Sequence, residues 1–246
     1  MKVRLSVTTA ASELPWEVVL TPGRSLVYGV LGRLEPTAGR RLHERGVGEY
    51  GMVPFGHGAP VFPKARRVRG RYAAGGSGTV EFGSPVPQLA ETLRKGFAER
   101  ELLDWGGVAL RLTRIEVIPP PAFSSGRARF RTSTPVVMKG DGRVQGEHPP
   151  SRQHWVLPGQ AQWVKYMQGN LVRKAETLGL DPAVRLEEVT WVGASRSFRV
   201  RGGVKPGAPV EVELSGPPET LRAVWSWGLG QANSAGFGWI SPHPMR

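Results

Sequence analysis

Two side chains in the first fifth of the chain are candidates for acid–base chemistry. His43 lies in the segment Leu42-His43-Glu44, and Tyr28 lies in Leu26-Val27-Tyr28-Gly29. An imidazole can give or take a proton near neutral pH, so a histidine is the commonest general acid or base. Taken alone, His43 is more simply interpreted as a solvent-exposed histidine at the end of a helix, beside Glu44 and Arg45.

A glycine-rich segment near the end of the sequence is its sharpest motif. It reads Gly228-Leu229-Gly230-Gln231-Ala232-Asn233-Ser234-Ala235-Gly236-Phe237-Gly238, two Gly-apolar-Gly units around five residues. Glycine permits positive φ and close backbone approach, so successive N–H groups can face a phosphate. The spacing is not that of a dinucleotide-binding fingerprint, and the Lys-Ser/Thr of a P-loop is missing. The alternative interpretation is a tight structural turn.

The charge of the chain indicates a polyanionic partner. The 246 residues include 33 Lys and Arg but 20 Asp and Glu, for a formal net charge of +13. Nucleic acid is the commonest partner of a protein with such an excess. A basic surface without a ligand is the alternative, and the basic residues are spread along the chain rather than gathered in one arm.

The composition also excludes several classes of site. Cysteine is absent, which rules out disulfides, thiolate nucleophiles and Cys-ligated zinc and fits a cytoplasmic protein. No run of about 20 apolar residues is present, and the N-terminus alternates like a strand rather than a signal peptide. His57, His148, His154 and His243 lack the spacing of a zinc site. We therefore expect no metal, no cofactor and no membrane contact.

Hydrophobic periodicity in the first half predicts strands and helices in a recognisable order. Apolar residues recur at helical spacing in 24–35 and 85–100, with a shorter helical stretch at 37–45. The expected strands are 2–8, 50–55, 79–82 and 108–118, with a basic strand or loop at 66–72 and a flexible turn at 73–78. The order strand-helix-strand-strand-helix-strand is typical of the ferredoxin-like fold.

The pattern starts again after Pro119-Pro120-Pro121, a stiff linker that we take as a domain boundary. The expected helices are 161–178, closed by Gly179, and 217–227, and the expected strands are 127–137, 184–192, 196–204, 209–214 and 237–240. We therefore predict an α+β chain of two tandem ferredoxin-like, or RRM-like, domains, residues 1–119 and 120–246.

Taken in order along the chain, these motifs resemble a known family. The glycine-rich segment resembles the corresponding loop of the RAMP superfamily and, within it, of the CRISPR repeat-processing endoribonucleases. Tyr28 and the Leu42-His43-Glu44 element are similar to that family's first-helix tyrosine and its Leu-His-Glu, at a matching spacing. Thr134-Pro135-Val136-Val137 is similar to the strand that opens its second domain, and Asn170-Leu171 with Lys174 to an Asn-Leu and Lys helix.

The resemblance implies a metal-independent endoribonuclease that cleaves CRISPR precursor RNA within its repeats. His43 would be the catalytic histidine and Tyr28 its partner, while the ribose 2′-hydroxyl attacks the adjacent phosphate and leaves a 2′,3′-cyclic phosphate and a 5′-hydroxyl. Some members of the family carry a lysine shortly after the histidine. Here Glu44 to Met52 contains none, so Arg45 or Lys64 would supply the charge.

The partners implied are CRISPR repeat RNA and, in an effector complex, other CRISPR subunits. The alternative from another class is a catalytically inactive RNA-binding RAMP subunit, in which His43 is only structural. Arginines at alternate positions of a strand share one face, as in 127–131. Aromatic residues near the basic runs, such as Tyr72 after Arg71, can stack on unpaired bases. The residues expected to contact RNA are Arg66, Arg67, Arg69, Arg71, Arg127, Arg129, Arg131, Lys139, Gly228, Gly230, Gln231, Asn233, Ser234, Gly236 and Gly238.

Overall fold

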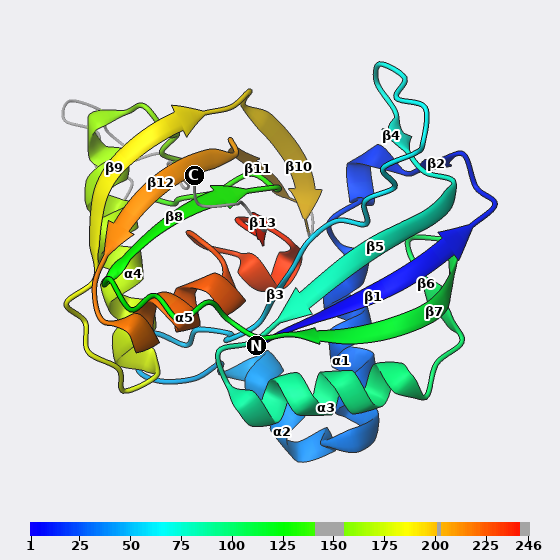
Figure 1. The fold of residues 1–246 in the computed structure, drawn as a ribbon, viewed down its shortest axis with the longest axis horizontal. Coiled ribbons are helices and arrows are strands. Elements are labelled where there is room, and N and C mark those ends of the chain that lie inside the picture. The colour runs from blue at the N-terminus through cyan, green and yellow to red at the C-terminus, as the bar shows by residue number, and fades with distance from the viewer. Residues whose placement is uncertain (141–154, 201–202, 242–246) are drawn as a thin grey trace.

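The computed structural model describes residues 1–140, 155–200 and 203–241. It has two β-sheet regions that lie side by side, each packed against its own helices (Figure 1). This mixed arrangement of helices and sheets confirms the predicted α+β class. Among the described residues, no helix is long and apolar enough to cross a membrane.

The first sheet is built around β1, which lies in its centre between β5 and β7. Alternation places Val3, Leu5 and Val7 of β1 in the core, each at most 1% exposed. The strands, in the sheet order β3-β5-β1-β7-β6, are β3 (Gly56–His57), β5 (Gly76–Gly83), β1 (Lys2–Thr9), β7 (Ala109–Ile118) and β6 (Leu102–Asp104). The associated helices are α1 (Pro22–Leu34), α2 (Pro36–Glu44) and α3 (Pro87–Ala98).

In the second sheet, too, the first strand lies inside the sheet: β8 lies between β12 and β13. Its strands, in the order β13-β8-β12-β9, are β13 (Ile240–Ser241), β8 (Arg127–Thr132), β12 (Val210–Ser215) and β9 (Arg185–Val192). The helices packed on it are α4 (Ala161–Thr177) and α5 (Pro218–Trp227). Smaller elements are the β2 (Glu13–Leu14) and β4 (Tyr72–Ala73) pair, the β10 (Arg196–Val200) and β11 (Gly203–Gly207) hairpin, and the 3-10 turns η1 (Trp16–Val18) and η2 (Asn233–Ala235).

Several predicted strand boundaries are wrong. Residues 50–55 form no strand, because Gly48 and Gly51 adopt positive φ and turn the chain before Pro54. The stretch 196–204 belongs to a hairpin, since two paired strands alternate just as one long strand does. The predicted turn 73–78 contains the first residues of β5, the strand 127–137 ends at Thr132, the last strand lies at 240–241, and β6 was not predicted.

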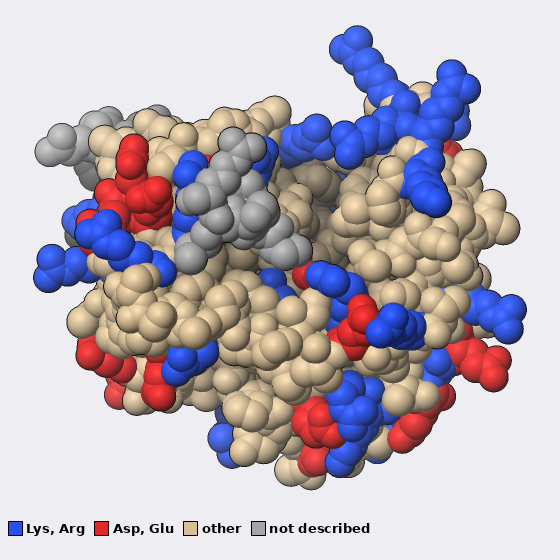
Figure 2. Space-filling view, viewed as in Figure 1, with Lys and Arg blue, Asp and Glu red and all other residues tan. Residues whose placement is uncertain are grey.

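Basic side chains gather over the loop that leads from β3 to β4. Figure 2 shows Lys and Arg side chains projecting at the top of the molecule, where Figure 1 places this loop. The loop carries five exposed basic residues: Lys64, Arg66, Arg67, Arg69 and Arg71. The sequence predicts a basic strand or loop at 66–72, and the structure places these arginines in a projecting loop.

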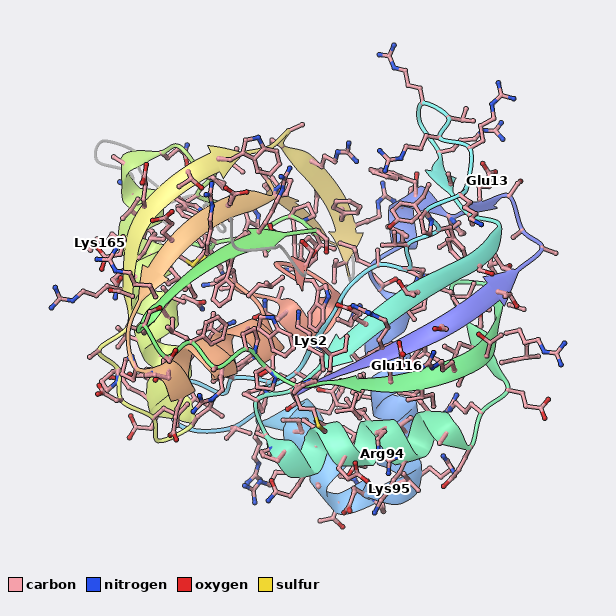
Figure 3. All side chains as sticks on the ribbon, in the orientation of Figure 1. Lys2, Glu13, Arg94, Lys95, Glu116 and Lys165 are labelled. Carbon is pink, nitrogen blue, oxygen red and sulfur yellow. The ribbon has the colours of Figure 1, made fainter. Side chains whose placement is uncertain are left out.

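Buried contacts join the two halves of the molecule. The main cluster of the first half also contains four side chains from the second: Val137, Phe198, Ala235 and Phe237. Lys2 lies at the junction (Figure 3), where its Nζ donates to the Ile240 carbonyl and sits 4.2 Å from the Trp239 ring centroid. The indole of Trp227 donates to the Val53 carbonyl at 2.9 Å. The glycine-rich loop is therefore packed into the core of the first half.

Candidate active site

The helices α1 and α2 bring Tyr28 and His43 together. Each helix has a proline in its first turn, where a missing N–H costs nothing, and Glu35 alone connects the two. The rings of Tyr28 and His43 meet edge to face, with 4.9 Å between their centroids and an 80° interplanar angle. Phe55 packs against the tyrosine at 5.6 Å. The tyrosine is half-buried and the histidine is exposed, so the imidazole is held in place but accessible.

Arg24 connects this pair with the glycine-rich loop. It precedes Tyr28 by one helical turn on α1, and its guanidinium carbon lies 5.0 Å from the tyrosine ring centroid. Its Nη1 donates to Ser234 Oγ at 2.6 Å. The sequence interpretation missed Arg24, although its i,i+4 spacing to Tyr28 was a usable signal.

Of the two cations expected near His43, Arg45 follows it by two residues, whereas Lys64 lies in another part of the fold. Arg45 is exposed at the C-terminal cap of α2, and Lys64 is exposed in the loop that leads to β4. In Figure 1, β4 lies at the top of the view and α2 at the bottom. Among the contacts described, the cation that lies over the Tyr28 ring is the guanidinium of Arg24.

The glycine-rich loop is braced from inside by Lys174 and Asn233. Lys174 is fully buried on α4, and its Nζ donates to the Gly228 carbonyl and, at 2.7 Å, to Asn233 Oδ1. The Asn233 amide nitrogen donates to the carbonyls of Leu229 and Phe237, both at 2.9 Å. Burial holds the pKa of Lys174 well below its usual value. These two side chains satisfy the inner carbonyls of the loop and fix its shape.

The four glycines of the loop mainly set its backbone conformation, because most of their N–H groups already donate hydrogen bonds within the protein. Gly228, Gly230, Gly236 and Gly238 all adopt positive φ, between 63° and 108°. The N–H groups of the first, third and fourth donate to the carbonyls of Val224, Asn233 and Pro135. A Cβ on Gly236 would lie 2.8 Å from the His57 ring. Contact between this loop and RNA stays a prediction, and the loop side chains Gln231, Asn233 and Ser234 line a cavity.

That cavity, of about 430 Å³, lies between the loop, α4 and residues 50–53. Asn170, Arg173, Lys174, Gln231 and Ser234 line it. The Asn170 Oδ1 atom is buried and has no hydrogen-bond partner among the described residues. Such an unpaired buried acceptor costs the fold about 1–3 kcal/mol.

Residues 118–242 match the family model described as CRISPR associated protein Cas6, C-terminal. The match spans half of the chain and includes the whole glycine-rich loop. The chain belongs to the Cas6 family of CRISPR-associated proteins. None of the curated proteins compared with the chain matches it.

Solved structures share the fold of this Cas6-family chain over its full length. An RAMP protein that binds different RNA substrates aligns over 98% of both chains, with a TM-score of 0.80 and 15% identity. A Cas6-related protein from Pyrococcus furiosus aligns over 100% of this chain and 99% of its own, with a TM-score of 0.80 and 14% identity. A CRISPR-associated Cas6 protein aligns over 99% of both, with a TM-score of 0.77 and 18% identity. At these identities the likeness concerns the fold.

The arginine face of β8 in this Cas6-family protein is partly neutralised. Arg127 and Arg129 are exposed and Arg131 is half-buried, on the predicted side of the strand. Glu211 on β12 forms ion pairs with Arg129 and, at 3.8 Å, with Arg131. The guanidinium of Arg131 also lies 4.4 Å over the Trp191 ring. Glu211 is itself buried and also accepts a hydrogen bond from Thr190 at 3.0 Å, so Arg129 and Arg131 are held by a partly buried ion-pair cluster and Arg127 is the most accessible of the three.

The remaining histidines contribute no cluster of ligands. His57 on β3 is fully buried, and burial lowers its pKa to about 4. Its ring packs against Gly23 of α1 and Gly236 of the loop, and it occupies the space that a side chain at either glycine would require. In the part of the chain that the structure describes, no three His, Asp or Glu side chains are grouped to hold a metal ion. His148, His154 and His243 lie outside the described residues.

Proposed function

We propose that this Cas6-family protein is an endoribonuclease that cleaves CRISPR precursor RNA within its repeats, without a metal ion. The observation that carries the proposal is the Tyr28–His43 pair with Arg24 beside it. A proton carrier and a fixed cation within a few ångströms of one ring are the groups that RNA transesterification requires. The glycine-rich loop completes the site, because Ser234 holds the guanidinium of Arg24.

The chemistry follows from the substrate. The ribose 2′-oxygen attacks the adjacent phosphorus, the new P–O2′ bond forms, and the P–O5′ bond breaks. One proton leaves the 2′-hydroxyl and one is taken up by the 5′-oxygen, so the products are a 2′,3′-cyclic phosphate and a 5′-hydroxyl. Among Arg24, Tyr28 and His43, histidine is the type that exchanges protons near neutral pH, so His43 carries one of these transfers. Arg24 faces the charge that develops on the phosphate oxygens.

Tyr28 acts as a positioning residue in this proposal. Its hydroxyl is shielded from solvent, while its ring supports the imidazole on one side and packs on Phe55 on the other. A ring held between two partners has few alternative rotamers, so it fixes the direction of the His43 ring. The attacking group exists only in RNA, so DNA of the same sequence would be bound or ignored but not cut.

We also propose that the two halves are ferredoxin-like domains, divided near residue 119. In each sheet the first strand lies between the third and the last, as β1 lies between β5 and β7 and β8 between β12 and β13. Two helices on one side of an antiparallel sheet complete such a unit. The site would then be an inter-domain site, since Arg24 belongs to one unit and Ser234 to the other.

The test is a single-turnover cleavage assay in EDTA with a labelled repeat RNA from the host's own CRISPR array. We expect one cut, with the cyclic phosphate on the 5′ fragment. His43→Ala should lower the rate by about 10²–10⁴-fold and leave RNA binding unchanged. Arg40→Ala, an exposed change on the same helix, is the matched control and should cut at the wild-type rate. A single 2′-deoxyribose at the cut site should abolish cleavage.

Each contrary result has a distinct meaning. Tight binding of the repeat without any cutting by the wild type would replace the proposal with that of an RNA-binding subunit. Cutting that survives His43→Ala would keep the endoribonuclease and move its active site. Cutting of the 2′-deoxy substrate would exclude the 2′-hydroxyl mechanism, and loss of cutting in EDTA would exclude a metal-independent reaction.

A further inference from the structure

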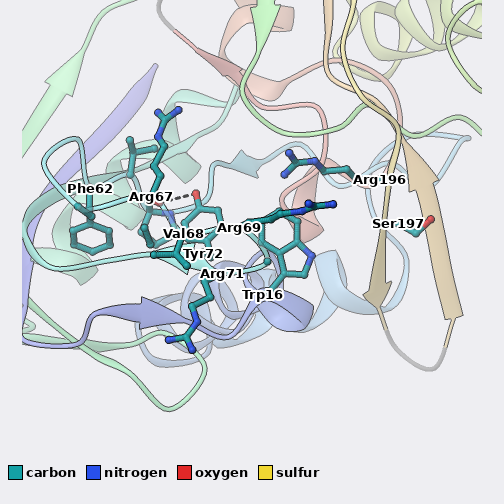
Figure 4. A pocket seen from close by; sticks show the side chains of 14 residues that line it. Trp16, Phe62, Arg67, Val68, Arg69, Arg71, Tyr72, Arg196 and Ser197 are labelled. Carbon is teal, nitrogen blue, oxygen red and sulfur yellow. Dashed lines mark hydrogen bonds between the residues drawn. The ribbon is translucent and has the colours of Figure 1, made fainter.

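A basic pocket opens where the loop between β3 and β4 (residues 58–71, the β4 loop) meets strand β10 of the second half. Its volume is about 760 Å³. Figure 4 shows the side chains that line it, among them Trp16 and Tyr72 with arginine side chains near them. The arginines that line it are Arg67, Arg69, Arg71 and Arg196. None of the described residues that line it is acidic, although Glu13 pairs with Arg71 at 3.2 Å beside it.

The aromatic side chains of the pocket are fixed before any ligand arrives. Trp16 lies 5.9 Å from Tyr72 and 5.5 Å from Phe198, measured between ring centroids. The Tyr72 hydroxyl donates to the Pro60 carbonyl at 2.8 Å (Figure 4). Burial raises the pKa of Tyr72 to about 12, so the phenol stays uncharged beside an anionic ligand. The cost of ordering these rings is therefore already met in the free protein.

Arg196 closes the pocket from the other half of the molecule. Its guanidinium carbon lies over the Trp16 ring, 5.0 Å from the ring centroid, within the range of a cation–π contact. The side chain is exposed, so its outer face is open. A planar ring can lie against that face, while the guanidinium edge and the arginines of the β4 loop meet negative charge.

An apolar and aromatic wall with a rim of arginines matches one class of ligand. A nucleotide has a planar base that stacks on aromatic rings and guanidinium planes, and a phosphate that arginine binds with two parallel hydrogen bonds. A base inside a duplex has both faces covered by its neighbours, so only an unpaired nucleotide can present its face. The pocket is separate from the Tyr28–His43 pair, because none of its lining residues belongs to α1 or α2.

We propose that this pocket binds an unpaired nucleotide of the RNA, with the base against Trp16, Tyr72 and Arg196 and the phosphates against the arginines of the β4 loop. The proposal rests on RNA as the substrate, which is part of the proposed function, but not on cleavage. Because its two sides come from the two halves, a bound nucleotide would also hold the β10–β11 hairpin against the β4 loop.

The first test measures binding of a short dye-labelled oligouridine by fluorescence anisotropy. Trp16→Leu, Arg67→Ala and Arg196→Ala should each weaken binding by about tenfold, the range found for stacking and phosphate contacts. Arg196→Lys keeps the charge but loses the planar stack, and should also weaken binding. Arg185→Ala is the control, because it removes one exposed arginine from β9 that does not line the pocket. A blunt RNA duplex should bind equally to the wild type and to Arg196→Lys.

The second test locates the nucleotide directly. An oligonucleotide that contains 4-thiouridine, crosslinked by ultraviolet light, should attach to the peptide that contains Trp16 or to the one that contains Tyr72. Crosslinks confined to other peptides would overturn the proposal. It would also be overturned if Arg196→Lys and Arg67→Ala bound the oligouridine as tightly as the control Arg185→Ala does. Binding of free UMP as tight as that of the oligouridine would also overturn it in favour of a mononucleotide site.

Failure of this proposal can be told apart from failure of the proposed function. If the pocket variants bind RNA normally while the wild type still cuts the repeat, the pocket is wrong and the nuclease stands. If they bind RNA weakly but the wild type never cuts, the pocket stands and the nuclease is wrong. Arg185→Ala, which lies outside both the pocket and the Tyr28–His43 pair, should bind the RNA and cut it as the wild type does.

Discussion

The imidazole of His43 meets the ring of Tyr28 edge to face, with 4.9 Å between the ring centroids. The two residues lie on consecutive helices, and the tyrosine ring is itself supported by Phe55. The histidine is thus oriented by packing, while its accessible edge faces outward.

Tyr28→Phe keeps this packing and removes only the hydroxyl, which is shielded from solvent. We expect the single-turnover cleavage rate to stay within about tenfold of wild type, whereas Tyr28→Ala should lower it by about 10²-fold, since misplaced catalytic groups lose about that much. Equal losses in the two variants would instead assign the hydroxyl a direct role in the chemistry. RNA affinity, measured in the same samples, should not change.

Arg24→Ala removes the cation beside Tyr28 and should lower the cleavage rate by about 10²–10³-fold, as expected for a group that stabilises a developing charge. Ser234→Ala keeps the cation but removes the hydroxyl that holds it, so its loss should be smaller than that of Arg24→Ala. Arg33→Ala, an exposed change on the same helix, serves as the control. Wild-type rates for Arg24→Ala would remove Arg24 from the proposed site.

Lys174→Met should destabilise the protein, because it leaves the Gly228 carbonyl and Asn233 Oδ1 buried without a donor. Each unpaired buried acceptor costs about 1–3 kcal/mol, so the urea midpoint should fall well below that of wild type. Lys165→Met, an exposed lysine on the same helix, should change the midpoint little. A midpoint for Lys174→Met equal to wild type would show that Lys174 does not brace the loop.

The stability of the fold should depend on pH through His57. Its pKa is lowered by burial from 6.5 to about 4, so between these values the unfolded chain binds a proton that the folded chain does not. Stability is therefore lost as the pH falls through this window, by about 3 kcal/mol from this group.

Urea unfolding at pH 7 and pH 4.5 measures this loss. His57→Asn should be less stable than wild type at pH 7, because the buried ring is replaced by a smaller group. It should nevertheless lose less stability between the two pH values. An equal loss in both proteins would show that other groups cause the acid sensitivity.

Local sequence patterns determined much of the framework of this protein. The apolar spacing of α1, the alternation of β1 and the prolines that begin the helices are properties of neighbouring residues, so they can be read without a structure. The net charge of +13 and the absence of cysteine limited the partners and the chemistry in the same way. The candidate pair Tyr28 and His43 and the glycine-rich loop were also visible as motifs, and the structure brings the pair together and places Arg24 against the loop.

Local patterns failed where a turn interrupts an extended run. Residues 50–55 look like a strand by composition, but the backbone at Gly51 turns them into a loop. The alternation in 196–204 is shared by two strands of a hairpin, because pairing partners leave no mark on the alternation.

Only the tertiary structure decided which distant residues form the sites. Arg24 and Ser234 are 210 positions apart, and Trp16 and Arg196 come from different halves of the chain. No periodicity links such residues, because their contact depends on how two sheets with their helices pack together. The burial of Lys174 could not be predicted for the same reason. A lysine in a helix is expected at the surface, but the fold packs the glycine-rich loop around its amine.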